Sequence, residues 1–397
     1  MEKFKESPVS EIVSKPPPRN RVLVYGRPDS PEAYAIRDLL SRSGVVFDWI
    51  ELAGDDDGRR ALGLSTLDHV QLFDGVQLFA PTVWEVAERL GWMTQPRLRE
   101  YDLSIYGAGP AGLSAAVYGA SEGLRTVLIE REVVGGQAGT SSLIENFLGF
   151  PEGISGAELA ERARKQAMKF GAEVLLLREQ NRIHVDLADG SGMVARANIC
   201  ATGVEYRRLE LANENQLLNA GVYYGSGASE ASMCRDEHVI VVGGGNSAAS
   251  LSTYLLVRVT QTTNVEILYH AQVTELKGET VLSEVEISDM RDGSKRLIPT
   301  RRLFVCIGGV PNTEWAKDTA IVRDEAGYLV TGPDLLRQGR APECWPLART
   351  PFFLETSVPG SFAAGDVRHG SVKRVASAVG DGAMAVTFVH RYLEETA

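Results

Sequence analysis

Residues 103–112, LSIYGAGPAG, decide the fold of this 397-residue chain. The apolar run at the start of the stretch predicts a buried strand, and the residues from the proline to about position 123 predict a helix. Between them the glycines follow the pattern G-x-G-x-x-G. The first glycine allows a tight turn, the second lets the backbone approach a pyrophosphate, and the third lets the helix pack on the strand. We therefore predict a dinucleotide-binding unit with contacts from Gly107, Gly109, Pro110, Ala111 and Gly112.

A carboxylate stands where such a unit needs one. Residues 126–130, TVLIE, predict the next strand, and Glu130 ends it with Arg131 beside it. This is about 20 residues beyond the glycines, where a carboxylate can accept hydrogen bonds from a ribose diol. A glycine-rich turn that binds nothing would not need all these features together, so the ligand-binding interpretation is favoured.

A second strand end, far along the chain, distinguishes FAD from NAD. Residues 361–366, SFAAGD, predict an apolar strand that ends in Gly-Asp, and a helix begins near Val375. Asp366 at the strand end can bind a ribitol hydroxyl, and the N–H groups of the helix start can meet phosphate or ring oxygens. The sequence therefore predicts FAD as the cofactor.

Further motifs occur between these two sites, and their order resembles that of a known family. They are Gly135-Gly136-Gln137, Ile144-Glu145-Asn146, Phe150-Pro151, Ala201-Thr202-Gly203 and Gly243-Gly244-Gly245. From about residue 101 to its C-terminus the chain resembles the low-molecular-weight thioredoxin reductases. These are flavoproteins of the class II pyridine nucleotide-disulfide oxidoreductase superfamily.

The resemblance implies an α/β fold with two Rossmann-like dinucleotide-binding domains, each of the three-layer ββα type. The FAD domain would comprise residues 101–210 and 301–397, and an inserted NAD(P)-binding domain residues 211–300. A homodimer is also implied. The family usually has glutamine at the position of Val375. The implied FAD contacts are Gly136, Gln137, Asn146, Thr202, Gly203, Gly365, Asp366 and the backbone of Arg374, Val375 and Ala376.

Residues 21–92 predict a separate small domain of strand, helix, strand, hairpin and helix, which resembles a glutaredoxin. A flexible leader, residues 1–20, precedes it, and a linker, residues 93–100, follows it. A glutaredoxin carries its redox cysteines at the loop–helix junction, where a helix N-terminus lowers a thiol pKa. This chain has Ser30-Pro31-Glu32-Ala33 there. We therefore expect a structural or docking domain.

The chain also lacks the paired cysteines of a thioredoxin reductase. Its cysteines are Cys200, Cys234, Cys306 and Cys344, and the residues where the resemblance places C-x-x-C are Gly225-Ser226-Gly227-Ala228. Thiol–disulfide exchange needs two sulfurs that can bridge. We therefore do not expect thioredoxin-disulfide reductase activity by the family mechanism.

The second glycine motif predicts a nicotinamide site with contacts from Gly243, Gly245, Asn246 and Ser247. A strand expected at residues 265–269 is followed by no arginine before Arg291, whereas NADPH-dependent family members carry basic residues there. About one helix–strand segment is absent after Ser250, and a smaller shortfall falls near residues 178–181. Either the domain is shortened or this sequence omits some of its residues; as it stands we expect it to bind NADPH poorly, and the choice between NADH and NADPH stays open.

The composition excludes several partners. The formal net charge is −11 and no stretch is basic, which argues against nucleic acid. No apolar run is long enough for a bilayer, the first residues carry no secretory signal, and no cysteine–histidine set has zinc spacing. We expect a cytoplasmic protein without a metal site. No catalytic residue is assigned; His270 is expected at the surface, and His369 is the better functional candidate.

Three functions are consistent with these features. The first is an FAD-dependent oxidoreductase that passes electrons from a nicotinamide or another donor to an acceptor other than a protein disulfide. Such an acceptor would be a small molecule or a redox protein. The second is a ferredoxin–NADP reductase-like enzyme, since those reductases also lack C-x-x-C. The third is a flavin-bearing redox sensor or docking module without turnover.

Overall fold

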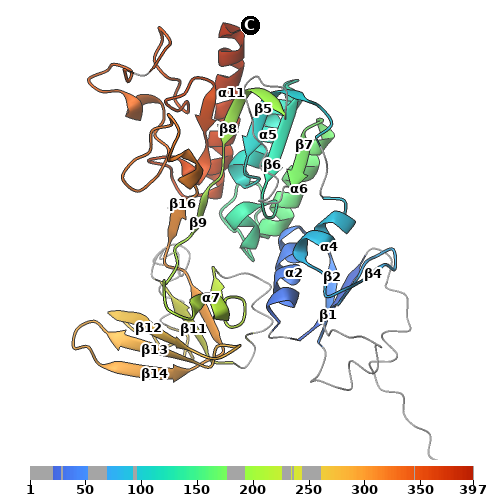
Figure 1. Ribbon diagram of the computed structural model, residues 1–397, viewed down its shortest axis with the longest axis vertical. Helices are drawn as coiled ribbons and strands as arrows, with labels where there is room; N and C mark the ends of the chain where they lie inside the picture. The colour runs from blue at the N-terminus through green and yellow to red at the C-terminus, as the bar shows by residue number, and fades with distance from the viewer. Residues whose placement is uncertain are drawn as a thin grey trace, which may run out of the picture. The chain divides into compact units, whose positions relative to one another are not determined.

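The computed structural model describes most of the chain (Figure 1). The described residues are 21–27, 30–51, 69–92, 96–176, 193–225, 234, 237–243, 261–343 and 345–396. They fall into two compact units. The first lies within residues 1–41, 45–90 and 206–308, and the second within residues 42–44, 91–205 and 309–397. The predicted leader and the strand expected at residues 183–187 lie outside the described residues.

A five-stranded sheet forms the core of the second unit. Its order is β17-β8-β5-β6-β7, and every neighbouring pair is parallel. Tyr106 lies opposite Cys200, and Cys200 lies opposite Ala363, so the carboxyl ends of these strands meet at one edge. The strands are β5 (Glu100–Tyr106), β6 (Thr126–Glu130), β7 (Glu173–Leu176), β8 (Val194–Cys200) and β17 (Ser361–Ala363).

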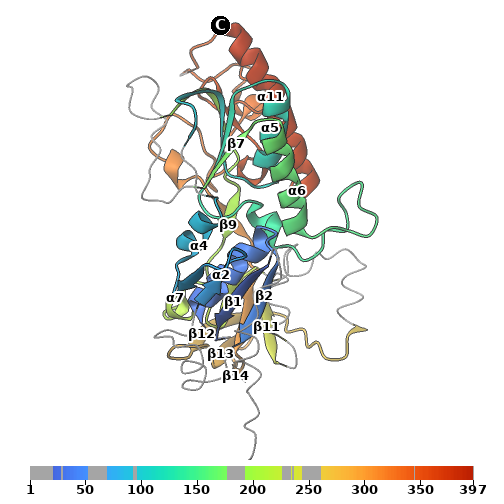
Figure 2. The same cartoon turned by 90° about the vertical axis from the view of Figure 1, so that its right-hand side faces the viewer.

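Three helices accompany this sheet, and Figure 2 shows them side by side. They approach closely because small residues face each other: a Cβ on Gly382 would lie 2.1 Å from the carbonyl oxygen of Ala111. Ser114 also donates a hydrogen bond to the carbonyl of Val379 (2.8 Å). The helices are α5 (Pro110–Ser121), α6 (Gly156–Lys169) and α11 (Val375–Glu395), with short 3₁₀ turns η1 (Gly136–Thr140), η3 (Glu314–Ala316), η4 (Gly332–Leu335) and η5 (Gly365–Val367).

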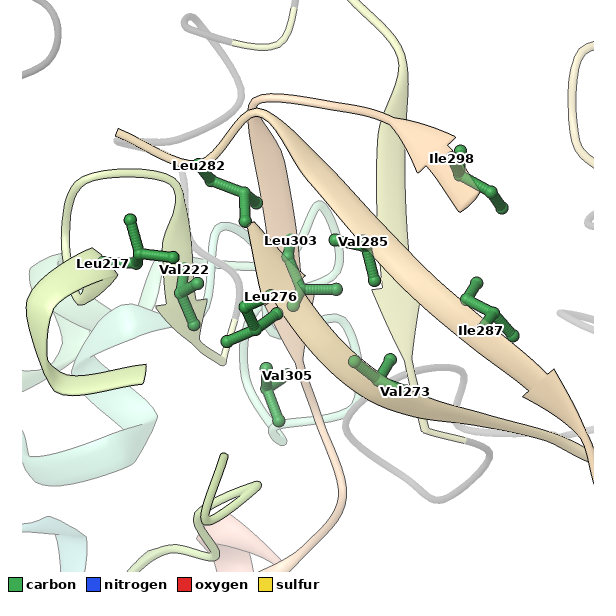
Figure 3. Packing of buried hydrophobic residues seen from close by; sticks show 10 residues of the cluster. All are labelled: Leu217, Val222, Val273, Leu276, Leu282, Val285, Ile287, Ile298, Leu303 and Val305. Carbon is green, nitrogen blue, oxygen red and sulfur yellow. The ribbon is translucent and has the colours of Figure 1, made fainter. Parts of the chain in front are cut away.

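Two three-stranded sheets form the C-terminal part of the first unit. The parallel sheet runs β10-β15-β11, and the antiparallel sheet runs β12-β13-β14. Figure 3 shows side chains of both sheets, among them Leu303 and Val285, in one apolar cluster with Leu217 of the short helix α7. The elements are β10 (Val222–Tyr224), β11 (Val239–Val242), β12 (Ala271–Lys277), β13 (Glu284–Asp289), β14 (Lys295–Pro299), β15 (Arg302–Val305) and α7 (Glu214–Leu217).

Two short strands connect the second unit with the first along the chain. β9 (Val204–Tyr206) follows β8, and β16 (Gly309–Pro311) follows β15. The two are hydrogen-bonded to each other as a two-stranded sheet. The chain therefore leaves and re-enters the second unit through one paired connection.

The predicted elements match the structure with one clear exception. The strand predicted at residues 126–130 coincides with β6. The strand predicted at residues 265–269 is wrong, because residues 265–268 form neither helix nor strand and Tyr269 is exposed. An alternating apolar run becomes a strand only where a neighbour accepts its backbone hydrogen bonds. Here the next strand, β12, begins at Ala271, where β13 supplies that neighbour.

The N-terminal domain has a four-stranded mixed sheet in the order β2-β1-β3-β4. β1 and β2 are parallel, whereas β3 is antiparallel to both β1 and β4. This agrees with the predicted sequence of strand, helix, strand, hairpin and helix. The elements are β1 (Val22–Gly26), α2 (Pro31–Arg42), β2 (Phe47–Glu51), β3 (His69–Gln71), β4 (Gln77–Phe79) and α4 (Val83–Arg89).

His69 is a buried histidine without polar contacts in this sheet. Its ring stacks on Tyr25 (4.3 Å between ring centroids) and lies 5.5 Å from the ring of Phe79. The side chain is 97% buried (3% exposed), and within the described part of the chain neither ring nitrogen has a hydrogen-bond partner. Burial lowers the pKa of His69 to about 4, because the imidazolium would lose its hydration.

We expect His69 to make this domain acid-sensitive. The unfolded chain binds the proton near pH 6.5 and the folded domain only near pH 4, so stability is full above about pH 7 and falls as the pH drops through this window. The loss is about 3 kcal/mol in total. Urea unfolding of wild type and His69→Phe, followed by tryptophan fluorescence at neutral and acidic pH, tests this. Equal pH dependence in both proteins contradicts the assignment.

Candidate functional site

The glycine turn lies at the carboxyl edge of the five-stranded sheet, between β5 and α5. Gly107 has φ +98° and a Cβ there would lie 2.4 Å from the carbonyl oxygen of Ala201. A Cβ on Gly112 would lie 1.8 Å from the carbonyl oxygen of Gly107. No other residue type fits these two positions.

Gly109 differs from its two neighbours because nothing crowds it. The nearest atom to a Cβ at this position would be the Cα of Gly136, at 4.0 Å. Gly109 is the N-cap of α5, it makes no side-chain cap hydrogen bond, and Pro110 and Ala111 follow as the first helical residues. The first-turn N–H groups of the helix therefore remain available to an anion such as a pyrophosphate.

Glu130 ends β6 beside this turn and is buried. Its Oε2 accepts a hydrogen bond from the N–H of Ala108 (2.7 Å), and its Oε1 accepts from the N–H groups of Arg131 and Glu132 (2.9 Å each). A carboxylate has about four acceptor positions, so Oε2 keeps one for a ribose hydroxyl. Burial raises the pKa of Glu130, and the N–H donors act in the opposite direction.

The next predicted contacts are tied to the loop that follows β8. Gln137 donates from Nε2 to the carbonyl of Val204 (2.8 Å), next to Gly203. Thr202 donates from Oγ1 to the carbonyl of Asn312 (2.9 Å). Gly136, with φ +54°, faces Gly109 across the turn. These residues from three separate segments are therefore held at the same sheet edge.

The fourth segment follows β17. Gly365 donates its N–H to Asp381 Oδ2 (3.1 Å), and Asp366 is half-buried just beyond it. Burial raises the pKa of Asp366, while the nearby Lys373 lowers it. Lys373 also donates from Nζ to the carbonyl of Asp366 (2.8 Å). This lysine was not predicted, because only the fold brings it against the strand end.

The helix α11 begins at this place. Arg374 is its N-cap and makes no side-chain cap hydrogen bond, and Val375 and Ala376 start its first turn. The N–H groups of Val375 and Ala376 have no acceptor within the helix and can meet phosphate or ring oxygens, whereas the N–H of Arg374 donates to the carbonyl of Val372 (2.7 Å). Asn146 is different: it is exposed, on a loop closed by the bridge between Ile144 and Ile154.

Asn312 is a second residue that the sequence did not indicate. It follows β16, and its N–H donates to the carbonyl of Gly203 (3.0 Å). Its side chain contacts the guanidinium of Arg131. No sequence motif marks Asn312, because it lies in neither glycine motif. It reaches the site only because the chain returns to the second unit through β16.

The residue at the first redox-cysteine position of the resemblance, Gly225, is closed in by a tyrosine. Gly225 has φ +79°, and a Cβ there would lie 2.5 Å from the hydroxyl oxygen of Tyr206. The ring of Tyr206 lies 6.4 Å from that of Tyr224, whose hydroxyl donates to the buried Glu214. Ser226, Gly227 and Ala228 lie outside the described residues.

Only the start of the second glycine motif is described. Gly243 follows β11 with φ +132°, while Gly245, Asn246 and Ser247 lie outside the described residues. Several cations that follow in the sequence are engaged in ion pairs: Arg291 with Asp289 (2.6 Å), Lys295 with Glu286 (2.8 Å) and Arg296 with Glu266 (2.9 Å).

In the N-terminal domain, Ser30 caps a helix at the position where the resemblance to a glutaredoxin places a cysteine. Ser30 accepts a hydrogen bond at Oγ from the N–H of Ala33 (3.1 Å) and donates to Glu32 (3.2 Å). His369 contacts Asp324 (2.6 Å). Among the described residues no group of three or more His, Cys, Asp or Glu side chains is arranged for a metal, and none of the described helices is long and apolar enough to cross a membrane.

Comparison with known proteins agrees with this geometry. The family model described as Pyridine nucleotide-disulphide oxidoreductase matches residues 101–259 and 249–382. Thioredoxin reductases of Treponema pallidum and Bacillus subtilis are each 31% identical over 323 aligned positions, which cover 74% of this chain and 98% and 95% of those proteins.

Solved structures of thioredoxin reductases are also similar to this chain. The thioredoxin reductases of T. acidophilum and Lactococcus lactis each have a TM-score of 0.62 and 27% identity with this chain. They cover 76% and 74% of this chain, and 100% and 99% of their own length is matched. Since the family model spans the glycine turn, Glu130 and the segment after β17, this chain belongs to the pyridine nucleotide-disulphide oxidoreductase family, among its thioredoxin reductase-like flavoproteins.

Proposed function

We propose that this chain binds FAD and passes electrons from the flavin to an acceptor that is not a protein disulfide. When bound, FAD supplies the redox chemistry, and the chain supplies binding, orientation and electrostatics. The electrons come from a nicotinamide or another donor. The acceptor is a small molecule or a redox protein.

The residues at the sheet edge fit FAD. The uncrowded Gly109 and the start of α5 suit a pyrophosphate, and the remaining acceptor position of Glu130 suits a ribose hydroxyl. Asp366 and the start of α11 lie at the end of a different strand, where they suit the ribitol and the ring. Two binding ends on one edge match an elongated dinucleotide better than a mononucleotide.

The observation that carries the choice of acceptor is the environment of Gly225. A side chain there would have to adopt a left-handed backbone and displace Tyr206. Tyr206 lies beside Tyr224, which is itself bound to Glu214 and accepts from the N–H of Leu209 (2.8 Å). A redox cysteine is therefore not only missing from this position but sterically disfavoured there.

The described cysteines do not substitute for it. Cys200 and Cys306 are buried, and burial raises the pKa of Cys200 to about 12 and also raises that of Cys306. A thiol must ionise to attack a disulfide. Cys234 is partly buried, and Cys344 lies outside the described residues.

We also propose that the nicotinamide domain is shortened and binds NADPH poorly. The alignments with the relatives run over 323 positions but cover only 74% of the 397 residues of this chain. Because 74% of the chain is fewer than 323 residues, some aligned positions hold residues of the relatives that this chain lacks. The family model matches in two stretches that overlap at residues 249–259, close to the predicted gap after Ser250. Ion pairing of Arg291 and Arg296 leaves less positive charge for a 2′-phosphate.

A flavin-bearing sensor or docking module is the second candidate. It is favoured by the N-terminal domain, where Ser30 serves as a helix cap at the position of a glutaredoxin cysteine. A glutaredoxin-like origin of this domain, a homodimer and a cytoplasmic location remain predictions. A ferredoxin–NADP reductase-like activity falls within the main proposal, with a redox protein as acceptor.

We expect the purified protein to contain one FAD per chain. Glu130→Gln should raise the dissociation constant for FAD about tenfold, because it removes a charged acceptor for the ribose. Quenching of flavin fluorescence on titration of the apoprotein measures this. Glu158→Gln, a change at an exposed carboxylate that pairs with Arg162, is the matched control. A wild-type protein that neither contains FAD nor takes it up contradicts the proposal.

We expect no reduction of thioredoxin at rates typical of enzymes, of the order of 1–10³ per second. The same holds for Gly225→Cys/Ala228→Cys, because Tyr206 fills the space that the first cysteine needs. A dithiol reporter assay, with an authentic thioredoxin reductase as positive control, measures the rate. Thioredoxin turnover by the wild-type chain would refute the assignment of the acceptor.

We expect NADH to reduce the flavin at least as well as NADPH. A lost charge-assisted contact to the 2′-phosphate costs about 1.5–3 kcal/mol, whereas NADH needs no such contact. Anaerobic titration of each nucleotide against the visible absorbance of the flavin compares them. A clear preference for NADPH contradicts the expectation, and no bleaching by either nucleotide favours the sensor.

A further inference from the structure

The backbone of Asn312 is held in place by three hydrogen bonds. Its N–H donates to the carbonyl of Gly203 (3.0 Å), and its own carbonyl accepts from Thr202 Oγ1 and Trp315 Nε1 (2.9 Å each). Two of these partners belong to the loop after β8 that the FAD site uses. Asn312 is therefore fixed to the site, although it was not among the predicted contacts.

The side chain of Asn312 reaches Arg131. In the amide orientation that pairs oxygen with donors, the oxygen accepts from Arg131 Nη2 (2.8 Å) and Nη1 (3.2 Å). Two carboxylates, Glu132 and Glu205, also lie 3.5 Å from the guanidinium, and both are more than half exposed. Among the described residues, the asparagine oxygen is thus the closest contact of this guanidinium.

We propose that Asn312 is a positioning residue through which the chain selects FAD over FMN. Arg131 directly follows Glu130, whose free acceptor position faces the ribose of the adenosine half. A guanidinium has five N–H donors, so the two that Asn312 holds leave others for that half. Without Asn312 the long side chain loses its preorganisation and turns toward the exposed carboxylates.

The selectivity follows from what each flavin contains. FMN carries the ring, the ribitol and one phosphate, which the proposed site meets through Asp366 and the start of α11. Only FAD carries the adenosine half that Arg131 meets. Removing Asn312 should therefore weaken FAD and leave FMN unchanged. This inference rests on the proposed FAD site.

The experiment measures dissociation constants of FAD and of FMN for the apoprotein of the full chain, by flavin fluorescence. Asn312→Ala should weaken FAD about tenfold and change FMN by less than about twofold. Asn312→Asp, which keeps an acceptor for Arg131, should restore most of the FAD affinity. The matched control is Asn215→Ala, which removes a similar contact with Arg208 (2.7 Å) away from the site, and it should change neither constant.

The outcomes separate this inference from the proposed function. If wild type binds FAD but Asn312→Ala binds it equally well, or loses FAD and FMN in the same proportion, the inference is overturned. Failure of Asn312→Asp to recover FAD affinity also overturns it. If wild type does not bind FAD at all, the proposed function fails first.

Discussion

The second unit depends on one close approach, between Gly112 and the carbonyl of Gly107. The distance of 1.8 Å that a Cβ would have to that oxygen means that helix α5 can lie against the end of β5 only without a side chain there. This contact aims the start of the helix at the carboxyl edge of a parallel sheet. Because all five strands are parallel, the segments after β5, β6, β8 and β17 arrive at that same edge.

At Gly225, where the resemblance places the first redox cysteine, aromatic side chains fill the space. Gly225, Tyr206 and Tyr224 form a packed group, and the hydroxyl of Tyr224 is bound to Glu214, which also pairs with Arg208. Burial and this carboxylate raise the pKa of Tyr224, so it remains a neutral donor. A dithiol needs conformational freedom and an ionisable sulfur, and this group supplies neither.

The charged side chains of the two units have different surroundings. At the sheet edge, burial raises the pKa of both Glu130 and Asp366, and the backbone N–H donors at Glu130 and the nearby Lys373 at Asp366 oppose this shift. In the first unit, Arg291 pairs with Asp289, which lies two residues before it at the end of β13, and Arg296 of β14 pairs with Glu266, which lies outside any strand.

The sequence by itself determined the glycine turn, the carboxylate at Glu130 and the strand before Asp366, because each depends on local spacing and on period-two or helical patterns. The strand predicted at residues 265–269 failed, since a strand also needs a neighbour that shares its backbone hydrogen bonds, and sequence does not show which segments pair. Only the tertiary structure revealed Asn312, Lys373 and the filling of the Gly225 site by Tyr206. Asn312 meets Arg131 only through the packing of distant segments, and Lys373, although only seven residues from Asp366, reaches its carbonyl only through the path of the chain between them, which no local pattern encodes.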